Sequence, residues 1–496
     1  MVRALSFEPR RLLAGAVRLG AAVLATGLVL LAGACGTRGA AAGQVSKRPA
    51  EPRGVLVISI DGLRADRIHL GGYDRATTPH MDGLAENGVL FDSMIAAAPM
   101  PVPAHISLLT GCDPNVSRST FRAGDSPDQN SSWRVHTGTP RLALEFALAG
   151  YRTLGLADGE ALGPLHGLSP GFHDLERPYL EEGHNERRGI ERSTLRLAQW
   201  VRSLNSEDSW FAYMHVGDLL RSFDAPDPRW STLFEPREEL DWVPPVAARE
   251  PAMFALPPSR WSGGMQPMAE YDLRYDGGLA RIDAAIGNCV ELLRSSGRLE
   301  QTTIAVVGAF GMQFGEAGLL VDHGRLSLAD LRVPLILRPA ESLQSQRGAV
   351  LGCLTSGIDL APTLLELAGL DGERMQGTSL WPVVQGAATT ANSHVFASGG
   401  LQNGFVVLSE DWALEELLVG DATSELVRGW FGDMEAHPSG VSRRLYSWRT
   451  DPYPSLVNGY VSPPGAGPAV VEALGHARTS WGRAVQALRQ GPVLGP

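Results

Sequence analysis

The residues best suited to chemistry are a carboxylate, a guanidinium and three imidazoles in separate segments of the chain. Carboxylates bind divalent cations, whereas arginine and histidine donate hydrogen bonds to anions. A site that combines both kinds of group can bind a cation or an anionic ligand. The five candidates for ligand binding are Asp61, Arg64, His105, His215 and His323.

Asp61 has the most informative position of the five, because it directly follows the apolar run VLVISI at residues 55–60. A continuous run rich in β-branched residues predicts a central strand that is buried on both faces. Open α/β sheets bind ligands at the carboxyl ends of such strands. Asp61 is therefore the first candidate site residue and the first candidate metal ligand. The alternative is that its side chain only caps the next turn.

The other candidates also have structural interpretations. His105 lies one turn into a helix expected to begin at Pro101, so it either contacts a ligand or packs and caps. His323 follows Asp322, and a local hydrogen bond between the two explains it as well as ligand binding does. Arg64 is expected to anchor the loop after the first strand.

The elements that must position these residues alternate between strands and helices. Apolar residues from Leu279 to Leu293 recur at helical spacing and predict an amphipathic helix. Strands that alternate with helices predict an α/β fold, with a mostly parallel sheet and helices on both faces. No internal repeat and no glycine-rich phosphate loop is visible. The other predicted strands are residues 210–216, 303–308 and 333–337.

Composition limits the classes of partner. The 496 residues, 44% of them hydrophobic and 20% charged, suffice for one large α/β domain and a smaller C-terminal unit. A formal net charge of −11, with Lys47 as the only lysine, argues against a nucleic-acid partner. Cys112, Cys289 and Cys353 cannot all pair, so at most one disulfide is expected among them.

The N-terminus has the pattern of a targeting segment. Four arginines precede an apolar run at residues 19–34, which ends in LLAGAC at Cys35. This ending resembles the lipobox of bacterial lipoprotein signal peptides, in which the cysteine is acylated. We therefore expect a signal peptide at 1–35, a tether at 36–53 and export, with a lipid anchor in a bacterial membrane that leaves the protein periplasmic or outer-membrane facing. A cleaved ordinary signal and an uncleaved anchor are the alternatives.

Several motifs match one family in the same order along the chain. The stretch ISIDGLRADRIHLGGYDRATTPHMDGLAENGVLFD at 58–92 is followed by PVPAHISLLTG at 101–111, and IDLAPTLLELAGLDGERMQGTSLWP comes at 358–382. In these motifs the chain resembles the sulfatase family of the alkaline phosphatase superfamily. The resemblance implies an alkaline phosphatase-like three-layer sandwich at 54–385, with a mostly parallel central sheet, and a smaller C-terminal α+β subdomain at 386–496.

The resemblance also implies which positions would carry the family's chemistry. Family members place a formylglycine, or a Ser or Thr hydroxyl, at the position of Pro101, whose ring supplies no attacking oxygen. They bind a divalent cation, usually calcium, with carboxylates at positions where Gly62, Ala309 and Phe310 stand here. Only Asp61 of that metal set remains. We therefore expect the family calcium site to be lost and no cofactor to be bound.

The family's hydrogen-bond donors are only partly retained. His105, His215 and His323 fall where the family has Arg or His, but Leu220 replaces a further histidine. Cys112 lies eleven positions after Pro101, about 16 Å away along a helix, which is too far to replace the nucleophile.

Two functions follow from this pattern. The favoured one is a catalytically inactive, exported lipoprotein that binds a ligand or partner, such as a glycan or sulfated ligand. The competing one is an active hydrolase of sulfuric or phosphoric esters with a rebuilt metal and nucleophile site. The nearby carboxylates that such a rebuilding would recruit are Asp66, Asp74, Glu316, Asp322 and Asp330.

Overall fold

The computed structural model describes residues 52–117, 133–159, 161–163, 166–178, 189–223, 228–246, 255–257, 260, 266–316, 319–399, 404–418, 441–450 and 476. The predicted signal peptide, with Cys35, and the tether as far as residue 51 lie outside the described residues. Among the residues that are described, no helix is long and apolar enough to cross a membrane. Cys112, Cys289 and Cys353 are free thiols.

A nine-stranded sheet forms the centre of the fold, in the order β10-β2-β9-β6-β1-β5-β3-β4, with β11 also paired to β2. Every neighbouring pair is parallel except those that involve β9, which runs antiparallel to both β2 and β6. The strands are β1 (Gly54–Asp61), β2 (Val89–Ile95), β3 (Arg152–Leu156), β4 (Asp174–Glu176), β5 (Trp210–Val216), β6 (Thr302–Phe310), β9 (Arg332–Arg338), β10 (Ala349–Leu351) and β11 (Thr355–Ser356).

Strand β1 shows why its sequence is a continuous apolar run. All eight of its residues are buried. Val55 and Val57 belong to the core on one face of the sheet, whereas Leu56 and Ile58 belong to the core on the other. Successive side chains of a strand point to opposite faces, so a strand covered on both sides needs apolar residues at every position. The predicted central strand is confirmed.

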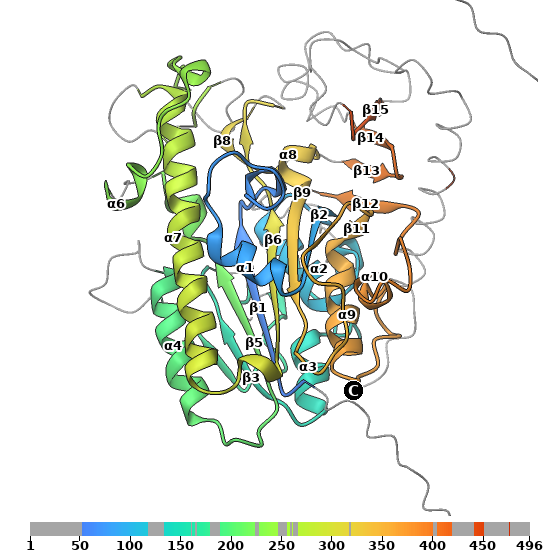
Figure 1. Ribbon diagram of the computed structural model, residues 1–496. Coiled ribbons are helices and arrows are strands. Elements are labelled where there is room, and N and C mark those ends of the chain that lie inside the picture. The colour runs from blue at the N-terminus through green and yellow to red at the C-terminus, as the bar shows by residue number, and fades with distance from the viewer. Residues whose placement is uncertain are drawn as a thin grey trace, which may run out of the picture. The chain divides into compact units, whose positions relative to one another are not determined.

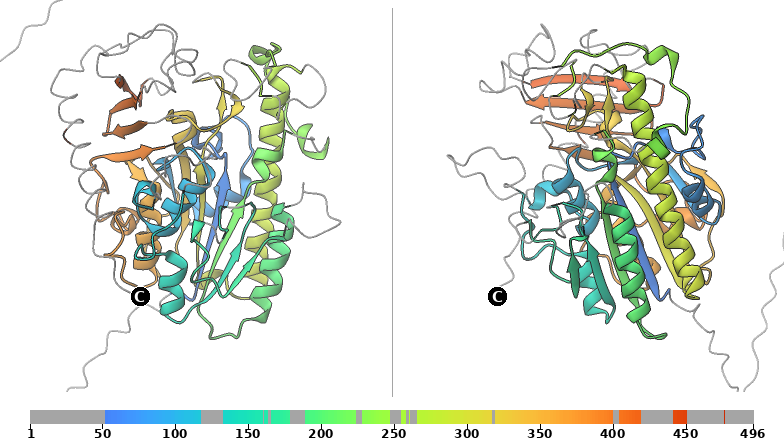
Figure 2. Two further views of the ribbon diagram at one scale, coloured as in Figure 1. Left: turned by 180° about the vertical axis from the view of Figure 1, so that it is seen from behind. Right: turned by 90° about the vertical axis from the view of Figure 1, so that its left-hand side faces the viewer.

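Helices cover both faces of this sheet (Figures 1 and 2). Helices α1, α4 and α7 contribute to the core on one face, and α2, α3 and α9 to the core on the other. The predicted amphipathic helix is part of α7, in which Leu279, Ile282 and Ile286 are fully buried. The helices are α1 (Pro79–Glu86), α2 (Pro101–Thr110), α3 (Leu142–Leu148), α4 (Gly189–Ser203), α7 (Met268–Ser295) and α9 (Leu360–Leu367).

Shorter elements lie in the connections between these strands and helices. They include the two-stranded sheet β7-β8. Their bounds are α5 (Asp218–Arg221), α6 (Pro228–Ser231), α8 (Leu328–Leu331), α10 (Trp381–Val384), β7 (Gln313–Phe314) and β8 (Leu320–Asp322). The observed architecture confirms the predicted α/β sandwich with a mostly parallel central sheet.

A smaller antiparallel sheet forms the described part of the C-terminal region, in the order β12-β13-β14-β15. It packs on the main domain, because Val395 and Ala397 join the same core as α2 and α9. The backbone N–H of Ser398 also donates to the carbonyl of Ala97 at 2.9 Å. The strands are β12 (Val395–Ser398), β13 (Gly404–Leu408), β14 (Trp412–Leu418) and β15 (Val441–Ser447). Except for His476, the predicted subdomain after residue 450 lies outside the described residues.

Candidate functional site

Three of the five candidate residues meet at the carboxyl end of β1. Asp61 is the last residue of β1, and His215 lies near the end of the neighbouring strand β5, paired in register with Ser59. His105 comes from α2, the helix that packs on this face of the sheet. The carboxyl ends of parallel strands meet at one edge, which explains why Asp61 and His215 are neighbours although they lie 154 positions apart.

The Asp61 carboxylate lies between the two imidazoles. Its Oδ1 is 3.0 Å from Nε2 of His105, and its Oδ2 is 2.9 Å from Nε2 of His215. The hydroxyl of Tyr213 lies 2.7 Å from Nδ1 of His105. The centroids of the two imidazole rings are 4.1 Å apart. Both oxygens of Asp61 therefore already have a partner.

The three side chains are almost completely removed from solvent: His105 is 0% exposed, His215 2% and Asp61 3%. Burial opposes the ionisation of Asp61, but the two histidines outweigh it and hold the pKa of the carboxyl well below its usual value. Burial likewise opposes charge on His215, yet the Asp61 carboxylate raises the pKa of that imidazole above its ordinary value. Burial and the neighbouring His215 lower the pKa of His105. The arrangement favours a carboxylate that is paired with a charged His215 and a neutral His105.

Apolar side chains surround the positions at which the family resemblance places metal ligands. A Cβ atom at Gly62 would lie 2.9 Å from Cδ2 of Leu220 and 3.6 Å from Cε of Met312. Phe310 pairs in register with Asp61, and both Phe310 and Met312 are 0% exposed. The ring of Phe310 packs against that of His323, with 4.7 Å between their centroids. At the positions where the family resemblance places further metal-binding carboxylates, this chain therefore has packed apolar side chains.

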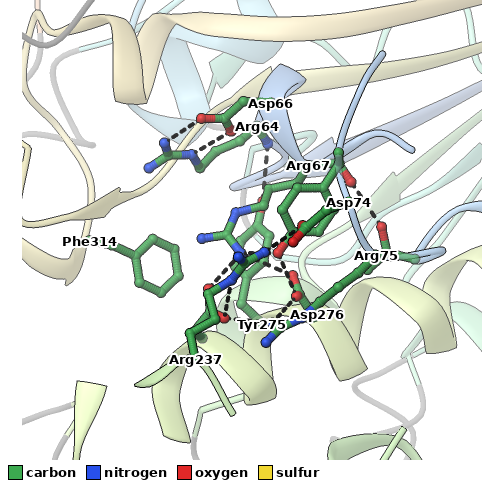
Figure 3. A network of polar contacts seen from close by, with 12 residues as sticks. Arg64, Asp66, Arg67, Asp74, Arg75, Arg237, Tyr275, Asp276 and Phe314 are labelled. Carbon is green, nitrogen blue, oxygen red and sulfur yellow. Dashed lines mark hydrogen bonds and ion pairs between the residues drawn. The ribbon is translucent and has the colours of Figure 1, made fainter. Parts of the chain in front are cut away.

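Arg64 does not join the three residues around Asp61. Its guanidinium forms ion pairs with Asp66 at 2.6 Å and Glu316 at 2.5 Å, and it donates to the carbonyl of Met312 at 2.9 Å. Figure 3 shows Arg64 beside a second network that ties the loop after β1 to α7. In that network Arg67 lies 2.6 Å from the carboxylate of Asp272. Arg64 therefore anchors the loop, as the structural interpretation of its position predicts.

His323 also lies apart from these three residues. It is only partly buried, its Nδ1 lies 3.3 Å from the carbonyl of Pro99, and its backbone N–H donates to Asp322 at 2.8 Å. Burial lowers the pKa of its imidazole. The local contact with Asp322 is thus present, although it involves the backbone of His323. Of the five candidates, His323 is the only one that is not fully buried.

The carboxylates proposed for a rebuilt metal site have other partners. Asp66 and Glu316 pair with Arg64, and Asp74 pairs with Arg237 at 2.5 Å. The carboxylate of Asp330 accepts from the backbone N–H of Arg325 at 3.0 Å and from the side-chain amide of Gln313. Within the described residues, Asp61, His105 and His215 form the only group of three or more ligand side chains close enough to share a metal ion.

The residues around Asp61 do not fit calcium. Calcium takes about 6 to 8 oxygen ligands, including several carboxylate or carbonyl oxygens. Here one carboxylate is available, its two oxygens face imidazole nitrogens, and Leu220, Met312 and Phe310 occupy the adjacent space. No step that depends on calcium can therefore be assigned to this chain.

Sequence reasoning missed two sets of residues that the structure places near this site. Tyr213 lies two positions before His215 on β5, so both side chains point to the same face of the sheet. Asp158 and Asp218 follow β3 and β5 as Asp61 ends β1, and both pair with Arg221. Burial and the neighbouring Asp158 raise the pKa of Asp218 to about 7. A search for carboxylates at every strand end would have found this pair.

Comparison with known proteins gives the family. The family model described as Sulfatase matches residues 53–370. The chain belongs to the sulfatase family. The expected family and fold are thereby confirmed.

Individual relatives are more distant. An arylsulfatase of Clostridium perfringens is 22% identical over 419 residues, which cover 72% of this chain and 84% of that protein. The human N-acetylglucosamine-6-sulfatase is 32% identical over 112 residues, 22% of this chain, and the match spans only 20% of the length of that relative. The crystal structure of a phosphonate monoester hydrolase of Agrobacterium radiobacter superposes with a TM-score of 0.64 at 20% identity, over 88% of this chain and 96% of the other.

A substitution at Gly62 tests whether Leu220 leaves room for a side chain where family members have a metal-binding carboxylate. It has a φ of +78° and packs against Leu220, so we expect Gly62→Asp to lower the free energy of unfolding by about 2–3 kcal/mol. Gly72→Asp is the matched control, because Gly72 also has a positive φ but has open space around its Cβ position. Denaturant unfolding measures both. Equal costs for the two substitutions would show that Leu220 does not close this position, and Leu220→Ala should recover part of the cost of Gly62→Asp.

Proposed function

We propose that this sulfatase-family protein is catalytically inactive and acts by binding a ligand or partner. The observation that carries the proposal is the replacement of both reactive elements at one place. Pro101 stands where the family nucleophile is expected, and apolar side chains stand where the metal carboxylates are expected. Loss of either element alone would remove most of the rate of ester hydrolysis.

The nucleophile position supports this proposal through its geometry. Pro101 is the first residue of α2, where a fixed φ and a missing N–H suit the start of a helix. Its pyrrolidine ring has no oxygen or sulfur that can attack an ester. Cys112 lies beyond the other end of α2, is 4% exposed, and burial raises the pKa of its thiol to about 11. A buried neutral thiol at that position is a poor substitute.

The donor residues support the same conclusion. In a sulfatase-type mechanism, histidines near the ester would donate hydrogen bonds to its oxygens. Here the Nε2 atoms of His105 and His215 both point to Asp61. They are buried, and Phe310 and Met312 lie in the same buried region. These two histidines hold an internal carboxylate instead of facing an open cleft.

The competing function is hydrolysis of a sulfuric or phosphoric ester at a rebuilt site. The cluster of Asp61, His105 and His215 is the observation in its favour, because such a cluster can bind a metal ion that activates water. The burial of the cluster argues against hydrolysis there, because each of the three residues is at most 3% exposed and an ester must reach the reacting atoms.

A sulfated sugar is the proposed ligand. The human relative is named for sulfated N-acetylglucosamine. Among the five candidate residues, the partly buried His323 is the one that such a ligand could contact. Binding would then take place beside His323, whose ring packs on Phe310, without contact with Asp61.

Export and a lipid anchor complete the proposed function. The motif LLAGAC at residues 30–35 provides the support, with Cys35 as the acylated residue. The protein would then present its ligand-binding surface outside the cytoplasm on a bacterial membrane.

Assays of hydrolysis test the proposed inactivity. We expect 4-nitrophenyl sulfate and 4-nitrophenyl phosphate to be cleaved no faster by the wild-type protein than by buffer, with or without added Ca²⁺, Mn²⁺ or Zn²⁺. His105→Gln and His136→Gln serve as site and control variants, since His136 is exposed. Saturable turnover that is lost in His105→Gln but kept in His136→Gln would establish the competing hydrolase.

Calorimetric titration tests the proposed ligand. We expect N-acetylglucosamine 6-sulfate to bind more tightly than N-acetylglucosamine, because the charged sulfate gains a charge-assisted hydrogen bond. His323→Ala should weaken that binding about tenfold, which corresponds to about 1.4 kcal/mol, whereas His136→Ala should not change it. Identical affinities for the two sugars, or for the wild type and His323→Ala, would contradict this assignment.

Metabolic labelling tests the anchor. Cells fed an alkyne-tagged fatty acid are expected to label the full-length chain, and Cys35→Ala should abolish the label. Cys353→Ala is the matched control, because Cys353 is a partly exposed free thiol of the folded domain. Retained label in Cys35→Ala, together with loss in Cys353→Ala, would place the acylation elsewhere.

A further inference from the structure

We infer that Asp61, His105 and His215 form a buried binding site for zinc, or for a similar divalent transition-metal ion, in place of the family's calcium. The inference stands on the donor atoms of this chain and does not depend on the proposed lack of activity. It replaces the sequence-based expectation that no cofactor is bound.

The donor atoms match zinc in kind. Two imidazole nitrogens and a carboxylate are ligands that zinc accepts readily, whereas calcium requires an oxygen-rich shell. Asp61, His105 and His215 supply one ligand atom each, and the second oxygen of Asp61 is a further donor on the same carboxylate. Three protein ligands of these types, two histidines and a carboxylate, form a known zinc-binding set.

The donor atoms also match zinc in spacing. Ligand atoms about 2.0–2.2 Å from one ion, at angles of 90–110°, lie roughly 3.0–3.4 Å from each other. Each oxygen of Asp61 lies 2.9 or 3.0 Å from an imidazole nitrogen, and one ligand atom from each residue lies within 4.8 Å of the other two. A small movement of the two rings toward each other would complete the shell.

One of the two histidines has the outer contact that is usual for a metal-bound histidine. Metal-bound histidines bind through one nitrogen and donate the N–H of the other to an oxygen. For His105, the hydroxyl oxygen of Tyr213 lies 2.7 Å from Nδ1. For His215, Nδ1 is buried and has no hydrogen-bond partner among the described residues, and neither does the buried Oδ1 of Asp158.

The segment that contains Asp158 passes beside the ring of His215. The Cβ position of Gly159, the residue after Asp158, would lie 3.7 Å from Cε1 of His215. The unpartnered Oδ1 of Asp158 therefore belongs to the segment nearest the unpartnered Nδ1 of His215. The Nε2 proton that faces Asp61 in the metal-free protein would be released to solvent on metal binding, and a proton kept on Nδ1 would leave the Nε2 lone pair of His215 to coordinate the ion.

The burial of the ligands determines what the ion does. Because the three ligands are at most 3% exposed, an ion between them has no room to bind and activate an ester. It would join β1, β5 and α2 as a structural link. It would also enter while the chain folds, so a chelator should remove it only after unfolding.

Metal analysis of the full chain tests the inference. We expect the purified protein to hold about one zinc per chain and no calcium, with zinc retained in His136→Gln and lost in His105→Gln and His215→Gln. Less than a tenth of an equivalent after refolding in excess ZnCl₂ would overturn the inference, as would equal zinc in all variants.

A second measurement uses cobalt in the wild-type chain, so it does not require the site variants to fold. The wild-type chain, unfolded with EDTA and refolded with CoCl₂, should show the visible absorption of a four-coordinate nitrogen and oxygen shell. Refolding with ZnCl₂ should raise the melting temperature above that of the metal-free refolded chain, whereas CaCl₂ should not. Absence of both the cobalt spectrum and the zinc-dependent shift would overturn the inference, and a shift with calcium alone would restore the family's usual metal.

Discussion

The buried carboxylate of Asp61 is the constraint on which the centre of this structure depends. A carboxylate that is only 3% exposed needs compensating partners, because removing its charge from water costs several kcal/mol. Those partners come from three parts of the chain, since Asp61 ends β1, His215 lies on β5 and His105 lies on α2. The contacts fix the distance of α2 from the sheet. Tyr213 then orients the ring of His105 from the same strand that carries His215.

The residues around that carboxylate are mostly apolar. A second acidic side chain at Gly62 would conflict with Leu220, and Met312 and Phe310 are fully buried nearby. These apolar groups lower the local polarity and strengthen the attraction between Asp61 and its two histidines. The apolar residues at these positions therefore favour the pairing of Asp61 with His105 and His215.

Much of the scaffold could be predicted from the sequence, because strong local patterns encode it. The run at residues 55–60 shows burial on both faces of β1, and the helical spacing around Ile282 shows the buried face of α7. The contacts of the site could not be predicted in the same way. Arg64 and His105 both looked like ligand-binding residues, but their partners lie far away in sequence: Glu316 for Arg64 and Asp61 for His105. Residue types alone do not show which acidic side chain an arginine or histidine will contact.

The loop that follows β1 is held in place by ion pairs that do not involve Asp61, His105 or His215. In that loop Arg67 and Arg75 each pair with Asp272 and Asp276 of α7, and both of these carboxylates are fully buried (Figure 3). Removing either arginine would leave a buried carboxylate with too little compensating charge. These ion pairs therefore hold the loop against α7 independently of any ligand or nucleophile. This network therefore keeps the loop after β1 in place beside α7, whatever the residues around Asp61 bind.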